Sequence, residues 1–111
     1  MENLELTDPH AFLKAEVWTL LEQVMDPEVG LDIVRMGLVY DLRYLQEENT
    51  IEVVMTLTSR GCPMGPMITQ NASQLLQDHY PDKDIHIRLV WTPAWTVDRI
   101  SEEGKQQLGW H

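Results

Sequence analysis

Two neighbouring segments with a period-two pattern constrain the fold of this chain more than any other feature. In residues 38–45, and again in residues 51–58, one set of alternate positions is consistently apolar. The first set is Leu38, Tyr40, Leu42 and Tyr44, and the second is Ile51, Val53, Met55 and Leu57. This alternation is typical of strands that bury one face, and the polar run 46–49 between them supplies a turn. The sequence therefore predicts an antiparallel hairpin whose apolar face other elements must cover.

Helical patterns flank this hairpin on both sides. Before it, Asp8-Pro9 provides a capping side chain followed by a residue that the first helical position tolerates. An apolar stripe at helical spacing then runs to the neighbourhood of Asp26-Pro27, and its members are Leu13, Val17, Leu20, Leu21 and Val24. After the hairpin, Ile68, Ala72, Leu75 and Leu76 fit a second helix that closes at Tyr80-Pro81. Each helix has one apolar face available to cover the sheet.

The remaining elements complete a two-layer fold. Residues 85–91 alternate again and predict a last strand, and residues 101–108 predict a short closing helix that stops at Gly109. The order α-β-β-α-β indicates an α+β domain with its helices on one face of a small, mainly antiparallel sheet. With 111 residues, the chain is expected to form a single domain over 1–111. Residues 1–8, before the first helix, are expected to be flexible.

Charge and cysteine content restrict the function classes. With 8 basic and 18 acidic side chains, the formal net charge is −10, and no basic cluster interrupts this excess. Nucleic acids and anionic membranes are therefore poor partners, because both are bound largely through basic groups. The acidic N-terminus and the short apolar runs predict a cytoplasmic protein. One cysteine, Cys62, excludes an internal disulfide and any zinc site that needs two thiolates from one chain.

The segment around Cys62 is the strongest candidate for chemistry. It joins the second strand to the second helix, and residues 61–66 contain two glycines and two prolines. A cysteine just before a helix is exposed to the helix dipole, which favours a thiolate, and Arg60 can add to that field. The alternative is that Cys62 is a small buried apolar residue, which is the commoner role of a free cysteine.

Two further segments carry unusual side chains. The link 26–34 contains carboxylates at Asp26, Glu28 and Asp32, which could bind iron weakly or orient a partner. For this link we favour the interpretation that Asp26 and Asp32 cap turns and helix ends. Around Pro93, two tryptophans could flank the cysteine loop as an aromatic wall or could close the open end of the core. The four histidines form no HxH or HxxxH pair, so a structural metal site is not expected.

Four separated motifs resemble the iron-sulfur cluster assembly domain family, whose members include SufT-type, PaaD-type and eukaryotic cytosolic targeting proteins. They are Asp26-Pro27-Glu28 with residues 30–34, Gly37-Leu38-Val39-Tyr40, Thr56-Leu57-Thr58-Ser59-x-Gly61-Cys62-Pro63, and Val90-Trp91-x-Pro93-x-Trp95-Thr96. The likeness spans about residues 13 to 109, and the stretch 61–66 is most similar to the bacterial SufT type. The PaaD type carries an additional cysteine-rich C-terminal segment that is not found here.

The resemblance implies a non-enzymatic factor that matures iron-sulfur proteins, working with SUF-type assembly proteins and apo clients. It implies Cys62 and Asp26 as the functional positions, with Thr58 lining the same surroundings. An iron-sulfur cluster is ordinarily held by four thiolates, whereas this chain offers only one. We therefore expect a labile cluster or iron, bound at Cys62 with ligands from outside the chain, or a targeting adaptor that binds neither. A homodimer would supply a second thiolate.

Two other functions stay open at this point. A thiol enzyme would use Cys62 as a nucleophile, but the sequence offers only scattered histidines as a base. A plain protein-interaction module would use the cysteine for packing alone. The reactivity of the thiol distinguishes these two alternatives, because a structural cysteine is inert.

Overall fold

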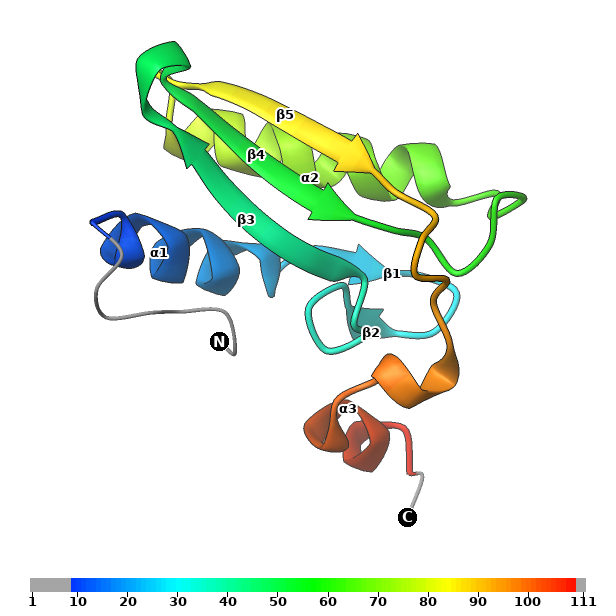
Figure 1. Ribbon diagram of the computed structural model, residues 1–111. Helices are drawn as coiled ribbons and strands as arrows, with labels where there is room; N and C mark the ends of the chain where they lie inside the picture. Colours follow the sequence, from blue (N-terminus) through cyan, green and yellow to red (C-terminus); the bar gives the residue numbers. More distant parts are fainter. Residues whose placement is uncertain (1–8, 110–111) are drawn as a thin grey trace.

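The computed structural model describes residues 9–109. In chain order its helices and strands are α1 (Ala11–Leu21), β1 (Met25–Asp26), β2 (Leu31–Asp32), β3 (Val39–Leu45), β4 (Thr50–Met55), α2 (Gly65–His79), β5 (Asp84–Leu89) and α3 (Glu102–Gln107) (Figure 1). The predicted α+β order, with its hairpin and short C-terminal helix, is confirmed. The expectation of a flexible segment 1–8 concerns residues outside those described.

The first helix is shorter than its apolar stripe predicts. It begins at Ala11, with His10 at the N-cap position, and it ends at Leu21 instead of near Asp26. The predicted cap Asp8 lies outside the described residues. The chain leaves the helix because Met25–Asp26 pair antiparallel with Leu31–Asp32 to form a two-stranded ladder. Val24 is still buried, but from the turn that follows the helix. A two-residue strand carries too little periodicity to be read from sequence.

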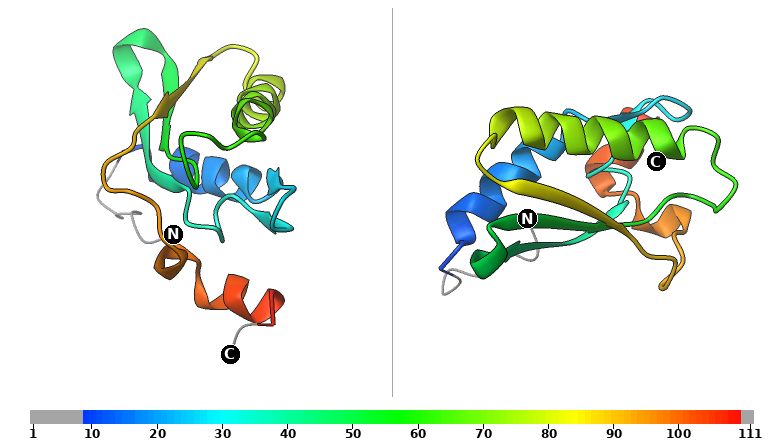
Figure 2. Two further views of the ribbon diagram at one scale, coloured as in Figure 1. Left: turned by 90° about the vertical axis from the view of Figure 1, so that its right-hand side faces the viewer. Right: turned by 90° about the horizontal axis from the view of Figure 1, so that it is seen from above.

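The main sheet has the strand order β3-β4-β5. Strands β3 and β4 form the predicted antiparallel hairpin, whereas β5 runs parallel to β4. A parallel neighbour requires a long crossover, and α2 provides it. Helices α1 and α2 both lie on the same face of this sheet, as the two views of Figure 2 show.

A β-bulge interrupts the alternation of β3. The pairing with β4 shifts between Val39 and Asp41, so that β3 has one extra residue at Tyr40. As a result Val39 and Leu42 are both buried, and the apolar set predicted for this strand does not continue through Tyr40. The Tyr40 hydroxyl instead donates a hydrogen bond to the carbonyl oxygen of Pro93 at 2.8 Å. The bulge thus directs Tyr40 toward the segment after β5.

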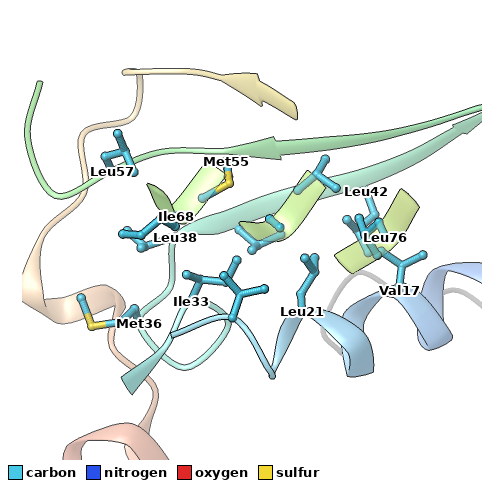
Figure 3. Close-up of a cluster of buried hydrophobic side chains, with 14 of the residues drawn as sticks. Val17, Leu21, Ile33, Met36, Leu38, Leu42, Met55, Leu57, Ile68 and Leu76 are labelled. Atoms are coloured by element: carbon cyan, nitrogen blue, oxygen red, sulfur yellow. The ribbon is translucent and has the colours of Figure 1, made fainter. Parts of the chain in front are cut away.

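The core lies between the sheet and the helices (Figure 3). It includes the apolar face of β4, the inner faces of α1 and α2, and residues of the β2–β3 link. Fully buried members are Val17, Leu21, Ile33, Met36, Leu38, Val53, Met55, Ile68 and Leu76. This agrees with the apolar faces predicted for the strand 51–57 and for both helices. None of the helices between residues 9 and 109 has the length and apolar run that a membrane crossing needs.

The C-terminal segment is attached to the β2–β3 link. The Ser101 N–H donates to the carbonyl oxygen of Arg35 at 2.9 Å, and Ile100 is buried. At the start of α3 the Ser101 hydroxyl accepts a hydrogen bond from the Gly104 N–H at 3.0 Å. Gly109, with φ of +80°, follows the helix as predicted. The short helix is therefore capped at its start and held against the domain.

Candidate functional site

Cys62 lies in the connection between β4 and α2, three residues before the helix begins at Gly65. Its N–H donates to the carbonyl oxygen of Ser59, and its own carbonyl accepts from the Gly65 N–H, both at 3.2 Å. The side chain is half-buried and unpaired with any other sulfur. Two successive turns therefore hold the backbone on either side of the thiol.

The two ends of this connection are anchored in the core. At its start, Thr56 is 1% exposed and its N–H donates to the carbonyl oxygen of Leu38 at 2.8 Å. At its end, Gly65 packs against Leu57, since a Cβ at this position would lie 2.6 Å from Leu57 Cδ1. A methyl group at this position would therefore require the end of the Leu57 side chain to move. Thr58, the other predicted site residue in this connection, is half-buried between these anchors and Cys62.

Arg60 joins the Cys62 connection to the segment that follows β5. Its guanidinium lies 4.7 Å from the centroid of the Trp91 ring, which is within cation–π distance. Trp91 thus reaches the cysteine connection, as the aromatic-wall interpretation predicts. Trp95 has the other predicted role, because its Nε1–H donates to the carbonyl oxygen of Met36 at 2.7 Å and closes the core there. The sequence pointed to both tryptophans but did not assign one role to each.

Asp26 is 2% exposed and shapes the turn between β1 and β2. Its Oδ1 accepts from the Glu28 N–H at 3.0 Å, and its carbonyl accepts from the Gly30 N–H at 2.8 Å. These are the local hydrogen bonds of a turn-capping aspartate, the role that the sequence favoured. Glu28 itself is exposed.

Asp32 also caps a turn, and it carries an ion pair. Its Oδ2 accepts from the N–H groups of Val34 and Arg35, and its Oδ1 lies 2.7 Å from Arg35 Nη1. Arg35 also pairs with Glu103 of α3. The hydrogen bonds that Arg35 donates to Asp32 and Glu103 raise the pKa of the guanidinium. Asp32 therefore helps to hold α3 in place.

The β1–β2 hairpin, which contains Asp26, and the connection that contains Cys62 lie at the same end of the molecule (Figure 1). The described histidines do not join them. His79 Nε2 lies 3.4 Å from Glu16, His86 Nδ1 lies 3.2 Å from Glu52, and His10 stacks edge-on with Tyr44. Among residues 9–109, no three or more His, Cys, Asp or Glu side chains are gathered closely enough to hold a metal ion.

A known protein family matches the part of the chain that contains these residues. The sequence model of a family described as iron-sulfur cluster assembly protein matches residues 14–88. This chain belongs to that family. The matched range contains Asp26, Thr58 and Cys62, and it ends within β5.

Two bacterial relatives are 44% identical to the chain. The Fe-S protein maturation auxiliary factor YitW of Bacillus subtilis matches over 97 residues, which are 87% of this chain and 94% of the relative. The Fe-S protein maturation auxiliary factor SufT of Staphylococcus aureus matches over 86 residues, which are 78% of this chain and 97% of the relative. The predicted membership of the SufT-like group is confirmed.

A solved structure has the same fold. The crystal structure of a domain of unknown function, DUF59, from Bacillus anthracis superposes with a TM-score of 0.82 at 38% identity. The match covers 88% of this chain and 92% of the other. The similarity therefore extends over nearly the whole described domain.

Proposed function

We propose that this protein matures iron-sulfur proteins as a carrier of iron or of a labile cluster, or as an adaptor that targets a cluster carrier to its client. The observation that carries the proposal is Cys62, the one thiol in the chain, which is half-buried on a connection anchored at both ends. A soft thiolate is the ligand that iron-sulfur chemistry uses. The family and the two named relatives support the same role.

Asp26 and Thr58 complete the proposed surroundings of the thiol. Thr58 lies four residues before Cys62 in the same connection. The Asp26 carboxylate keeps the neighbouring β1–β2 turn in shape through the Glu28 N–H. In this proposal Cys62 contacts the cargo, whereas the other two residues define the space around it.

The cargo is held weakly because the chain supplies too few ligands. A cluster is ordinarily held by four thiolates, and this chain has one. Among residues 9–109, no three or more His, Cys, Asp or Glu side chains are close enough together to hold a metal ion. The missing ligands must come from a client, from small thiols or from a second copy. Weak binding suits a protein that passes its cargo on.

We place this activity in the cytoplasm, with SUF-type assembly proteins and apo iron-sulfur proteins as partners, and we include a homodimer in the proposal. A thiol enzyme has less support, since a nucleophilic cysteine needs a base within hydrogen-bond reach. The histidines whose pairs the structure describes are held by Glu16 and Glu52, on α1 and β4.

Anaerobic reconstitution with iron and sulfide tests the proposal. The wild-type chain should develop charge-transfer absorbance in the visible range, and Cys62→Ser should not. Ser59→Ala, in the same connection, serves as the matched control and should behave as the wild type. If the wild type binds no iron but captures a cluster-loaded assembly protein through the Cys62 connection, the adaptor form of the proposal holds. If Cys62→Ser loads and delivers as well as the wild type, the proposal is wrong.

A further inference from the structure

Strand β5 has an unpaired outer edge. It lies at the end of the order β3-β4-β5, and Figure 2 shows no helix or strand of the described chain across its outer side. The N–H groups of Asp84 and Val90 donate inward, to Asn49 and Met55 at 3.0 and 2.9 Å. Because backbone groups of alternate residues point to opposite sides of a strand, those of Ile85, Ile87 and Leu89 point outward. This edge can therefore accept a further strand.

An uncharged groove accompanies this edge on the side of α2. It has a volume of about 360 Å³ and is lined by Thr69, Gln70, Ser73, Gln74, Ile87 and Leu89. Leu89 is 41% exposed, which is unusual for a large apolar side chain on a strand. No charged side chain lines the groove, although the chain carries a net charge of −10. Two acidic molecules can therefore approach each other here without like charges in direct contact.

The charge pattern along β5 is self-complementary when the pairing is centred on His86. In a two-fold antiparallel pair, outward-pointing residues must face outward-pointing residues, so each register is centred on a single residue. Centred on His86, the pairing places Asp84 opposite Arg88 of the second copy, twice by symmetry. In this register His86 faces His86 of the second copy. Centred on Arg88 the pairing would oppose two arginines, and centred on Ile87 it would oppose Arg88 and His86. Centred on Ile85 it would oppose Asp84 and His86, but only residues 84–86 of the strand would then pair. Opposite charges directly across a strand pair stabilise it, and like charges destabilise it.

The same register adds an apolar side chain to the groove at Ile87, while Leu89 faces Lys83 of the second copy. With His86 at the centre, Ile85 of one copy lies opposite Ile87 of the other, on the face that α2 covers. The three-stranded sheets of the two copies would then continue into one another. We propose that β5 pairs antiparallel with β5 of a second copy of this chain, centred on His86, and forms a weak homodimer. The inference rests on the β5 edge and stands or falls independently of the iron-sulfur role.

This dimer has a consequence for Cys62. The Cys62 connection begins where β4 ends, and β4 ends beside Leu89, the last residue of β5. A two-fold axis at His86 places that end of one copy against the beginning of β5 in the other. The two Cys62 connections therefore lie at opposite ends of the joined sheet. In this dimer each copy would present its thiol to a separate partner, so the ligands missing at Cys62 would come from a client or from small thiols and not from the second copy.

Charge reversal at the paired positions tests the register. The assay is sedimentation velocity of the full chain at low salt from about 1 μM to about 1 mM, the range of weak interfaces. The wild type should dimerise as concentration rises. Asp84→Arg and Arg88→Asp, both at exposed positions, should each weaken dimerisation at least about tenfold, because each places like charges opposite one another. Glu102→Arg and Lys105→Asp on α3 change the net charge equally and should have no effect.

The decisive experiment is to restore dimerisation by combining the two charge reversals. The double variant Asp84→Arg/Arg88→Asp should dimerise as the wild type does. An equimolar mixture of the two single variants should form a heterodimer, since the arginines of one chain then face the aspartates of the other. Circular dichroism should show that every variant is folded. A wild type that stays monomeric, single reversals without effect, or a mixture that fails to associate would overturn the proposal. So would binding of an extended peptide to the edge by a monomeric wild type.

Discussion

Cys62 is less buried than Thr56, Leu57 and Gly65, although its side chain still packs partly against the core. Thr56 and Leu57 are buried and hydrogen-bonded or packed, and Gly65 makes room for Leu57. The backbone of Cys62 makes two turn hydrogen bonds, and its side chain is half-buried. The backbone hydrogen bonds and the two anchors therefore hold the connection, and the cysteine side chain adds partial packing against the core.

Cys62→Ser should abolish client maturation in cells and leave stability nearly unchanged. Serine keeps the volume and the backbone hydrogen bonds but removes the soft ligand. We expect the unfolding midpoint to move by only a few degrees, since about 1 kcal/mol shifts it by roughly 4 to 8 °C in a domain of this size. The measurements are the activity of a client enzyme in a complemented strain and thermal denaturation. Full client activity in this variant would identify Cys62 as a packing residue.

Tyr80 should titrate above its ordinary range. Burial and a hydrogen bond from its hydroxyl to Glu16 raise the pKa of Tyr80. An acid with a raised pKa stabilises the fold below its unfolded pKa, near 10, and this contribution is lost as the pH rises above that value. In an alkaline absorbance titration, Tyr80→Phe should remove the phenolate component that appears late. An unchanged late component in Tyr80→Phe would contradict the assignment.

At the scale of elements, the short ladder β1–β2 and the bulge in β3 give the site its surroundings. Because β1 pairs with β2, helix α1 ends at Leu21, and Asp26 lies at the same end of the molecule as the Cys62 connection. The bulge sends the Tyr40 hydroxyl to Pro93, and Arg60 stacks on Trp91 in the same segment after β5. Strand β3 and the Cys62 connection are therefore both linked to the segment after β5, although the three are distant in sequence.

Gly30 and Gly37 have nearly equal positive φ angles but different surroundings. Substituting each by alanine therefore distinguishes the cost of backbone strain from the cost of a steric clash. Gly30 has a φ of +83° with open space around it, whereas Gly37, at +76°, would place a Cβ onto the carbonyl of Arg99. Gly30→Ala should cost roughly 1–2 kcal/mol for its left-handed backbone alone. Gly37→Ala should cost more, roughly 2–5 kcal/mol, because the segment 97–100 must also move. Urea denaturation measures both, and equal losses would show that the C-terminal segment yields without resistance.

At the scale of the whole molecule, the chain has many acidic side chains but few groups that are placed to bind iron. The chain carries 18 acidic side chains, yet the buried ones near the site, Asp26 and Asp32, are occupied by turn hydrogen bonds. In the proposed carrier role, one thiol and the groups that a partner brings would hold the iron, so we expect loading to depend on association with other molecules.

Reconstituted protein should carry less than one cluster per chain and should lose it readily. A chelator or an apo-client should remove the cargo within the time of mixing experiments, because most of its ligands come from outside the chain. Iron and sulfide analysis together with the decay of visible absorbance measure this. A monomer that keeps a full, chelator-resistant cluster would contradict the ligand count.

The sequence by itself determined the hairpin, the two helices apart from the end of the first, the short C-terminal helix that stops at Gly109 and the candidate thiol. These features depend on local patterns: the period of two around the polar turn 46–49, the stripes at helical spacing, and a cysteine between glycine and proline. The family motifs likewise stand in short continuous runs. Local propensity and the global fold agree at these positions, which is why they can be read without coordinates.

Only the tertiary structure decided the β1–β2 ladder, the parallel direction of β5, the bulge at Tyr40 and the separate roles of Trp91 and Trp95. Two-residue strands have no period to detect, and an alternating strand has the same pattern whether its neighbour is parallel or antiparallel. A bulge is a register shift between strands, and a stacking partner is chosen by the way distant segments pack. Each of these features depends on a second segment of the chain, so no local stretch of sequence contains it.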